Sequence, residues 1–308
     1  MSKNLSKISL VEYSELCRDV YKNMEPTTSI NHYLKELRWI RDEGFKKYEK
    51  TPFRARLYER TTDHVRVLVF RGSKTLHNWW YANRYVGLKQ HSEYLDLAQQ
   101  AYESACEAEL SPIAVTGHSL GGYLAQYVSI FMRKLGYQPR DGVELPCAIA
   151  FNPPHVGGLT TKLQIREVPS FSTIRGALNA SKHLNFTIEP GDGSVYPYIV
   201  NYRVTNDFVS QIGNLVGREY TLSATNACSV SEQMSRTSIY GRATNFLPGA
   251  PGKVVFGAVV GADYAACSYE AHAMDTVVTR LWIDATFNKN EILGVPVIPQ
   301  GLKQHDDH

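Results

Sequence analysis

Short apolar runs alternate with amphipathic segments along much of the chain. Runs of branched and aromatic residues bounded by turn residues predict strands at 55–60, 65–71, 112–116, 147–151 and 198–204. Leu, Ala, Tyr and Trp at helical spacing predict helices at 9–23, 30–48, 91–110, 120–135 and 271–283. Strands that alternate with helices are typical of βαβ units. We therefore predict an α/β fold, with a mostly parallel central sheet flanked by helices.

Two stretches interrupt this alternation. Residues 155–196 and 212–262 are rich in Gly, Ser, Thr and Asn and hold only short apolar runs. Long irregular segments in a compact domain are usually lids or binding loops, so we expect lid-like insertions there. Because the chain has no internal repeat and no low-complexity linker, we predict one domain over 1–308, with 1–50 as a helical amino-terminal extension.

The composition is that of an ordinary globular protein and excludes several function classes. Of the 308 residues 43% are hydrophobic and 20% charged, and the net charge of +3 is not gathered into a Lys/Arg block. Nucleic acid is therefore not an expected partner, whereas mild attraction to an anionic membrane surface is compatible with the charge. The oligomeric state is not addressed by these numbers.

Targeting and redox signals are weak. The first twenty residues lack the apolar core of a secretory signal, and the apolar run at 254–262 is too short to span a bilayer. We expect synthesis in the cytoplasm without a signal peptide and, if the protein is exported, a signal-independent route. Five widely separated cysteines without a CxxC pair argue against a disulfide framework or a zinc site.

The segment Gly117-His-Ser-Leu-Gly121 is the only G-x-S-x-G in the chain. It follows a predicted strand and opens a predicted helix, which is the setting of a nucleophile elbow. Its glycines allow the strand and the helix to approach closely, and the helix amino terminus lies beside the Ser119 hydroxyl. The alternative is a glycine-rich turn in which Ser119 is an ordinary helix cap.

An earlier strand end supplies a candidate for the oxyanion hole. The apolar strand predicted at 65–71 ends in Arg-Gly-Ser, and Gly72 lets the backbone turn so that the Ser73 N–H points at a developing oxyanion. The Leu120 N–H is the expected second donor. The alternative for Ser73 is an exposed serine in a turn.

Taken together, the motifs FRGS, NWW, GHSLGG, FNPP, NDFV and AHAMD resemble, in this order over residues 65–284, the class 3 lipase family of α/β-hydrolases. This resemblance implies hydrolysis of carboxylic esters of lipids without a metal or organic cofactor. It also implies a triad of Ser119 as nucleophile, Asp207 as acid and His272 as base, with Ser73 in the oxyanion hole. The amino-terminal 50 residues and the carboxyl tail lie outside the matched motifs.

The chain order supports the same histidine. In α/β-hydrolases the serine comes first, then the acid, then the histidine. His155 precedes every plausible acid, and so does His183 unless an unmatched carboxylate serves as the acid. The HDDH tail with His305 and His308 is typical of a solvated end, which leaves His272. His118 adjoins Ser119, but side chains diverge on a sharp elbow, so we expect it to support packing.

The acid is less sharply defined. Asp207 follows the predicted strand at 198–204, at the carboxyl end where open-sheet sites form. Asp192 and Asp263 are its rivals, and a turn aspartate is the alternative interpretation of all three, but we favour Asp207 as the acid. Trp79 and Trp80 follow the FRGS segment and are candidates for an acyl pocket or lid edge, with core packing equally compatible.

The predicted function is thus a serine ester hydrolase of lipase or phospholipase A type, whose partner is a lipid or other acyl-ester substrate. The basic charge and the missing signal lean slightly toward a phospholipid, including the hypothesis of a toxin-like effector. A soluble-substrate esterase, thioesterase or acyltransferase would use the same triad. A catalytically silent lipase-like binding domain is the alternative from another class.

Overall fold

The computed structural model describes most of the predicted core of the chain. The residues described are 8–22, 30–49, 53–73, 87–107, 113–134, 148–164, 183–205, 207, 209–222 and 272–287. No helix within these ranges combines the length and the apolar character needed to cross a bilayer.

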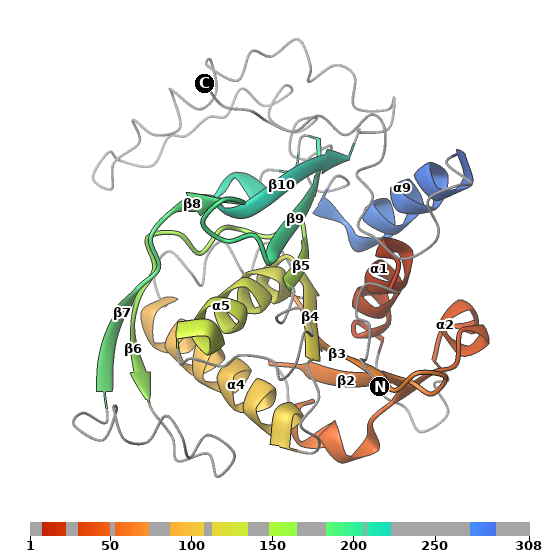
Figure 1. The fold of residues 1–308 in the computed structure, drawn as a ribbon, viewed down its shortest axis with the longest axis horizontal. Helices are drawn as coiled ribbons and strands as arrows, with labels where there is room; N and C mark the ends of the chain where they lie inside the picture. Colours follow the sequence, from red (N-terminus) through yellow and green to blue (C-terminus); the bar gives the residue numbers. More distant parts are fainter. Residues whose placement is uncertain are drawn as a thin grey trace, which may run out of the picture.

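The described strands form a large central sheet in the spatial order β1-β2-β3-β4-β5-β9-β10-β8 (Figure 1). In chain order they are β1 (Trp39–Arg41), β2 (Ala55–Arg60), β3 (Val65–Phe70), β4 (Ile113–His118), β5 (Ala148–Phe151), β8 (Gly191–Asp192), β9 (Ile199–Val204) and β10 (Val216–Leu222). From β3 to β8 neighbouring strands run parallel, and β1 and β2 join antiparallel at one edge. The carboxyl ends of β3, β4 and β9 therefore lie at one edge of the sheet, where open-sheet sites form.

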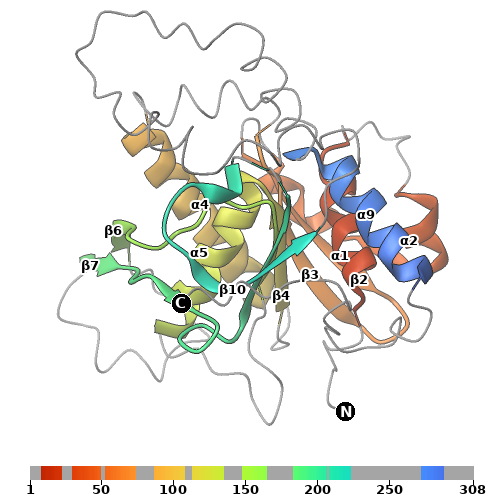
Figure 2. The ribbon, with the colours of Figure 1, turned by 90° about the horizontal axis from the view of Figure 1, so that it is seen from above.

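Helices cover both faces of this sheet, as Figure 2 shows. On one face lie α4 (Gly87–Glu107) and α5 (Leu120–Lys134), and on the other α1 (Leu10–Asp19) and α9 (Met274–Phe287). The short α2 (His32–Glu36) borders the second face, and a hairpin of β6 (Thr160–Gln164) and β7 (His183–Thr187) stands apart from the sheet. The class of fold predicted from the sequence is confirmed.

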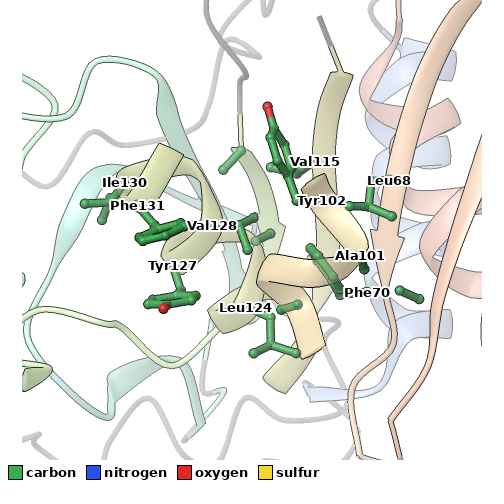
Figure 3. Close-up of a cluster of buried hydrophobic side chains, with 14 of the residues drawn as sticks. Leu68, Phe70, Ala101, Tyr102, Val115, Leu124, Tyr127, Val128, Ile130 and Phe131 are labelled. Atoms are coloured by element: carbon green, nitrogen blue, oxygen red, sulfur yellow. The ribbon is translucent and has the colours of Figure 1, made fainter. Parts of the chain in front are cut away.

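Two apolar layers hold the helices on the sheet. Figure 3 shows the first, in which side chains from α4 and α5 meet side chains from β3 and β4. Its labelled members are Leu68, Phe70, Ala101, Tyr102, Val115, Leu124, Tyr127, Val128, Ile130 and Phe131. The second layer joins α1 and α9 to the opposite face. All six residues of β3 and of β4 are buried, which explains why these strands read as nearly continuous apolar runs.

Local signals explain the bounds of α1. The Ser9 hydroxyl accepts from the Glu12 N–H at 3.2 Å, and the Glu12 carboxylate accepts from the Ser9 N–H at 2.9 Å, which together form a capping box.

The bounds of the predicted strands agree with the structure within two residues. The bounds of the predicted helices at 9–23, 91–110, 120–135 and 271–283 agree within four residues.

The helix predicted over 30–48 is wrong. The structure has α2, then β1, then the 3-10 helix η2 (Glu43–Tyr48) in its place. Arg38 adopts a positive φ of 63°, which ends any helix, and the Asp42 carboxylate caps η2 by accepting from the Gly44 N–H. The expected helical extension over 1–50 is therefore mixed, and β1 within it is the edge strand of the central sheet.

The first part of the expected insertion over 212–262 is a strand of the central sheet and not a loop. Residues 216–222 are β10, which pairs with β9 from Arg218 to Leu222. Val216 is buried in the first apolar layer and Tyr220 and Leu222 in the second, with the polar Arg218 and Glu219 between them, so the segment looked like a loop by composition. Likewise β8 and the β6–β7 hairpin lie within the expected insertion over 155–196. Residues 223–262 lie outside the described residues.

Candidate active site

Ser119 lies on a sharp turn between β4 and α5. Its φ is +58°, in the left-handed region that non-glycine residues seldom adopt. A Cβ on Gly121 would collide with the Phe70 carbonyl oxygen, and a Cβ on Gly117 with the Gly121 backbone. The glycines thus allow the close approach that holds the serine in this conformation, and the predicted elbow is present.

Backbone hydrogen bonds fix the elbow to its neighbours. The Ser119 N–H donates to the Phe151 carbonyl at the end of β5 at 2.9 Å, and the Ser119 carbonyl accepts from the Tyr123 N–H at 3.1 Å. The serine is therefore bound on one side to the sheet and on the other to the first turn of α5.

Three side chains from distant segments form a hydrogen-bonded chain that includes this serine. Ser119 Oγ lies 2.8 Å from His272 Nε2, and His272 Nδ1 lies 2.9 Å from Asp207 Oδ1. Ser119, His272 and Asp207 are 4%, 3% and 1% exposed, so the chain is shielded from water. His272 lies just before α9, and Asp207 follows β9.

The Asp207 carboxylate is held from two further directions. Its Oδ1 accepts from the Val209 N–H at 3.0 Å and its Oδ2 from the Ser210 N–H at 3.2 Å, both at the 3-10 helix η4 (Val209–Gln211). With the Nδ1–H of His272 bonded to this carboxylate, Nε2 is left to accept a proton from Ser119. The geometry is that of a nucleophile, a base and an orienting acid.

The predicted oxyanion residues flank the same serine. Ser73 follows Gly72, and a Cβ on Gly72 would lie 3.0 Å from the Cβ of Ser119, so the loop after β3 touches the elbow. Leu120 is the first residue of α5, and the first N–H groups of a helix have no partner within the helix. The turn before Ser73 thus contacts the elbow, and Leu120 adjoins Ser119 at the start of α5.

His118 is buried but does not bond to Ser119. Its Nδ1 lies 2.8 Å from the Tyr21 hydroxyl and its Nε2 2.6 Å from the His272 carbonyl oxygen. Burial, with the neighbouring His272 ring adding to the effect, lowers the pKa of the His118 imidazole from 6.5 to about 3. The expected packing role thus includes two hydrogen bonds. Tyr21 was missed because no local pattern links it to a residue 97 positions later.

The rival residues lie elsewhere or outside the described residues. Asp192 is exposed, and its carboxylate accepts from the Ser194 hydroxyl at 2.6 Å, which lowers its pKa. His155 lies 3.0 Å from Glu219 Oε2, and the backbone of His183 opens β7. Positions outside the described residues are Trp79, Trp80, Asp263, His305 and His308. Over the described ranges, no three His, Cys, Asp or Glu side chains gather in a way that could hold a metal ion.

The parallel sheet, the strand–serine–helix elbow and the helices on both faces define an α/β-hydrolase. Residues 12–136, less than half of the chain, match a family model described as "Phospholipase-like: Tle-like phospholipase domain". The predicted resemblance to lipases and phospholipases is thereby confirmed. The match also extends into the first 50 residues, which the motifs alone had left outside the resemblance.

Solved structures similar to this chain include fungal lipases. Lip2 lipase from Yarrowia lipolytica is 17% identical, with 71% of this chain and 81% of that chain covered and a TM-score of 0.45. The propeptide complex of Rhizomucor miehei lipase is 15% identical, with 70% and 68% covered and a TM-score of 0.39. A mutant form of MDLA from Penicillium cyclopium is 16% identical, with 70% and 78% covered and a TM-score of 0.37. No curated protein sequence matches this chain.

Proposed function

We propose that this protein hydrolyses carboxylic esters of lipids, with Ser119 as the nucleophile. The observation that carries the proposal is the continuous chain of hydrogen bonds from Asp207 through His272 to Ser119, on an elbow with positive φ. The description of the matched family, a phospholipase domain, supports a lipid as the substrate class.

In the proposed acylation step, Ser119 Oγ attacks the carbonyl carbon while His272 Nε2 takes the hydroxyl proton. The Asp207 carboxylate holds the Nδ1–H tautomer and stabilises the imidazolium that forms. The same Nε2–H then protonates the alcohol oxygen, so that the ester C–O bond breaks and a Ser119 acyl ester remains. In the second step a water gives its proton to His272 and attacks this ester, which releases the fatty acid and restores the serine.

The negative charge that develops on the tetrahedral carbonyl oxygen must be stabilised by hydrogen-bond donors. We assign this role to the N–H groups of Leu120 and Ser73, because the first begins α5 and the second follows the Gly72 turn packed on Ser119. Loss of a single such donor typically costs about 10²- to 10³-fold in kcat.

Among lipid esters, the acyl esters of glycerophospholipids are the first substrates to test. The family description points to them, and the net charge of +3 is compatible with peripheral contact with an anionic bilayer. Synthesis without a signal peptide and signal-independent export stay predictions, as does the position of the acyl chain that is cleaved.

The test exposes the protein to defined phosphatidylglycerol and phosphatidylcholine vesicles, triacylglycerol emulsions, short-chain p-nitrophenyl esters and a soluble acyl thioester, with products identified by mass. Ser119→Ala should abolish release of fatty acid, whereas Ser129→Ala, which also trims a buried serine on α5, should leave it unchanged. A fluorophosphonate probe should label Ser119 alone.

The alternatives give different results in the same experiment. Turnover restricted to the soluble esters or thioester, without a rise above the micelle threshold, would identify a soluble-substrate esterase. Acyl transfer to an added alcohol in preference to water would identify an acyltransferase. Wild-type protein that is inert on every ester and unlabelled by the probe would overturn the enzymatic function altogether and leave a binding domain.

A further inference from the structure

Tyr21 lies just after α1, and its side chain contacts His118, the residue that precedes Ser119 at the elbow. Arginines from the β2 region hold the backbone on either side of Tyr21. Arg54 Nη1 donates to the carbonyls of Val20 at 3.3 Å and Lys22 at 2.9 Å, and Arg56 Nη2 donates to the Lys22 carbonyl at 3.0 Å. Two buried guanidinium groups thus fix the chain from which the Tyr21 side chain projects.

From this position the Tyr21 hydroxyl joins two segments of the proposed active site. It packs against Gly72, where a Cβ would collide with it, and lies 2.8 Å from His118 Nδ1. His118 Nε2 lies 2.6 Å from the His272 carbonyl oxygen, which can only accept, so Nε2 carries the proton. Nδ1 is then an acceptor, and the Tyr21 hydroxyl donates to it. The contact with Gly72 and the two hydrogen bonds form one continuous path from the turn after β3 to the His272 backbone.

Both side chains in this path remain uncharged. Burial keeps the pKa of His118 at about 3 and raises the pKa of the Tyr21 hydroxyl above its ordinary range. The His118 and His272 rings are 4.9 Å apart between centroids. A cation at His118 would oppose the imidazolium that must form on His272, so a neutral ring supports the backbone without this cost.

We propose that Tyr21 and His118 are a positioning pair for catalysis, an inference that rests on the proposed function. Through its packing contact with Gly72, Tyr21 supports the turn that presents the Ser73 peptide to the oxyanion. Through the His272 carbonyl, His118 holds the backbone of the base. One hydrogen-bonded unit thereby sets the oxyanion donor and the base relative to Ser119, although neither Tyr21 nor His118 touches the reacting atoms.

A purely structural pair would contribute to stability and leave the chemical step unchanged. A positioning pair instead acts on the transition state, in which the oxyanion and the imidazolium exist together. Its removal must lower kcat, leave KM nearly unchanged, and weaken analogues of the tetrahedral intermediate by the same factor as kcat/KM.

The first experiment compares Tyr21→Phe with wild type on monomeric p-nitrophenyl butyrate. We expect a loss in kcat of about tenfold, with KM within about twofold, because small displacements of reacting groups cost one to two orders of magnitude. Inhibition by a trifluoromethyl ketone should weaken about tenfold in parallel. The matched control is Tyr58→Phe, which removes a buried hydroxyl 2.8 Å from Asp19 Oδ2 on the same layer of the fold. It should lower stability and preserve kcat.

The second experiment is a double-mutant cycle with His118→Leu. If the two residues act as one unit, the double variant should lose about as much kcat as either single variant, not the product of the two losses. Multiplicative losses, a full kcat in Tyr21→Phe, or an effect on KM alone would overturn the positioning role. If His118→Leu does not fold, the Tyr21→Phe and Tyr58→Phe comparison decides. A wild type that is inert and unlabelled by fluorophosphonate would count against the proposed function instead.

Discussion

The buried His118 imidazole should make the stability of this protein fall in mild acid. In the native state its pKa is lowered from 6.5 to about 3, first by burial and second by the adjacent His272 ring. In the unfolded chain the ring is in water and has its ordinary pKa. Between these two values the unfolded state binds a proton that the native state does not.

The sign and size follow from proton linkage. Because the unfolded state holds the extra proton, the contribution of His118 to stability is complete above pH 6.5 and is lost as the pH falls toward about 3. At pH 5 the unfolded ring is almost fully protonated and the native ring is not, so about 2 kcal/mol is lost relative to pH 8. Further acidification costs about 1.4 kcal/mol per pH unit until the native ring titrates.

The measurement is the free energy of unfolding in urea at pH 8 and pH 5, for wild type and for His118→Leu. The variant should be less stable at pH 8, because the Tyr21 hydroxyl and the His272 carbonyl lose their partner. The gap between the two proteins should shrink by about 2 kcal/mol at pH 5, because only wild type still loses the His118 contribution. All other titrating groups are common to both proteins and cancel in the difference.

Tyr21→Phe separates burial from hydrogen bonding. It removes the hydroxyl but leaves the imidazole in place, and burial is the main cause of the low pKa. Its stability should therefore keep the wild-type dependence on pH. Parallel stability curves for wild type and His118→Leu between pH 8 and pH 5 would refute the argument, since they would mean that the native ring takes up a proton as readily as the unfolded one.

Three further predictions concern the elbow and its surroundings. Asp207→Asn should lower kcat by about 10⁴ while the melting temperature stays close to that of wild type, because the amide cannot fix the Nδ1–H tautomer; near-normal turnover would contradict its role. Gly121→Ala should lower the free energy of unfolding by about 3 kcal/mol or more, or prevent folding, because the added methyl group collides with the Phe70 carbonyl. In the same urea titrations, the surface control Gly44→Ala should change the free energy of unfolding only slightly. Burial raises the pKa of the Cys17 thiol to about 12, so this thiol should not react with a disulfide reagent at pH 8 until the protein unfolds. Rapid labelling of Cys17 in the native protein, identified by mass, would contradict this prediction.

The predictable part of this fold consists of elements whose signal is local. β3 is buried on both faces and therefore appears as the nearly unbroken run VRVLVF. The glycines around Ser119 are needed because of contacts within the elbow and with the adjoining strand end, so a five-residue pattern was enough to identify the turn. The order of serine, acid and histidine narrowed the candidates further, and the structure places those three side chains within hydrogen-bonding distance.

The wrong expectations arose where tertiary contacts override local pattern. Over 30–48 the spacing of apolar residues suits a helix, yet Trp39 lies in β1. There its indole N–H donates to the buried Glu12 carboxylate at 2.9 Å. Over 216–222 no regular alternation is present, because the backbone turns at Gly217, where φ is 85°, so that Val216 is buried in one apolar layer and Tyr220 and Leu222 in the other. In both segments the deciding contact comes from a distant part of the chain.

The same reasoning explains why Tyr21 could not be found from the sequence, and what its place implies. The path from Gly72 to His272 includes hydrogen bonds across 97 and 154 positions, so no window of the chain contains it. Ser119 itself depends on such contacts, because a positive φ persists only where the surroundings hold it. The segment carrying α1 and Tyr21 therefore contacts residues beside the elbow, and the family match that begins at residue 12 includes Tyr21. The segment that we predicted as a helical extension therefore packs, through Tyr21, against His118 in the candidate active site.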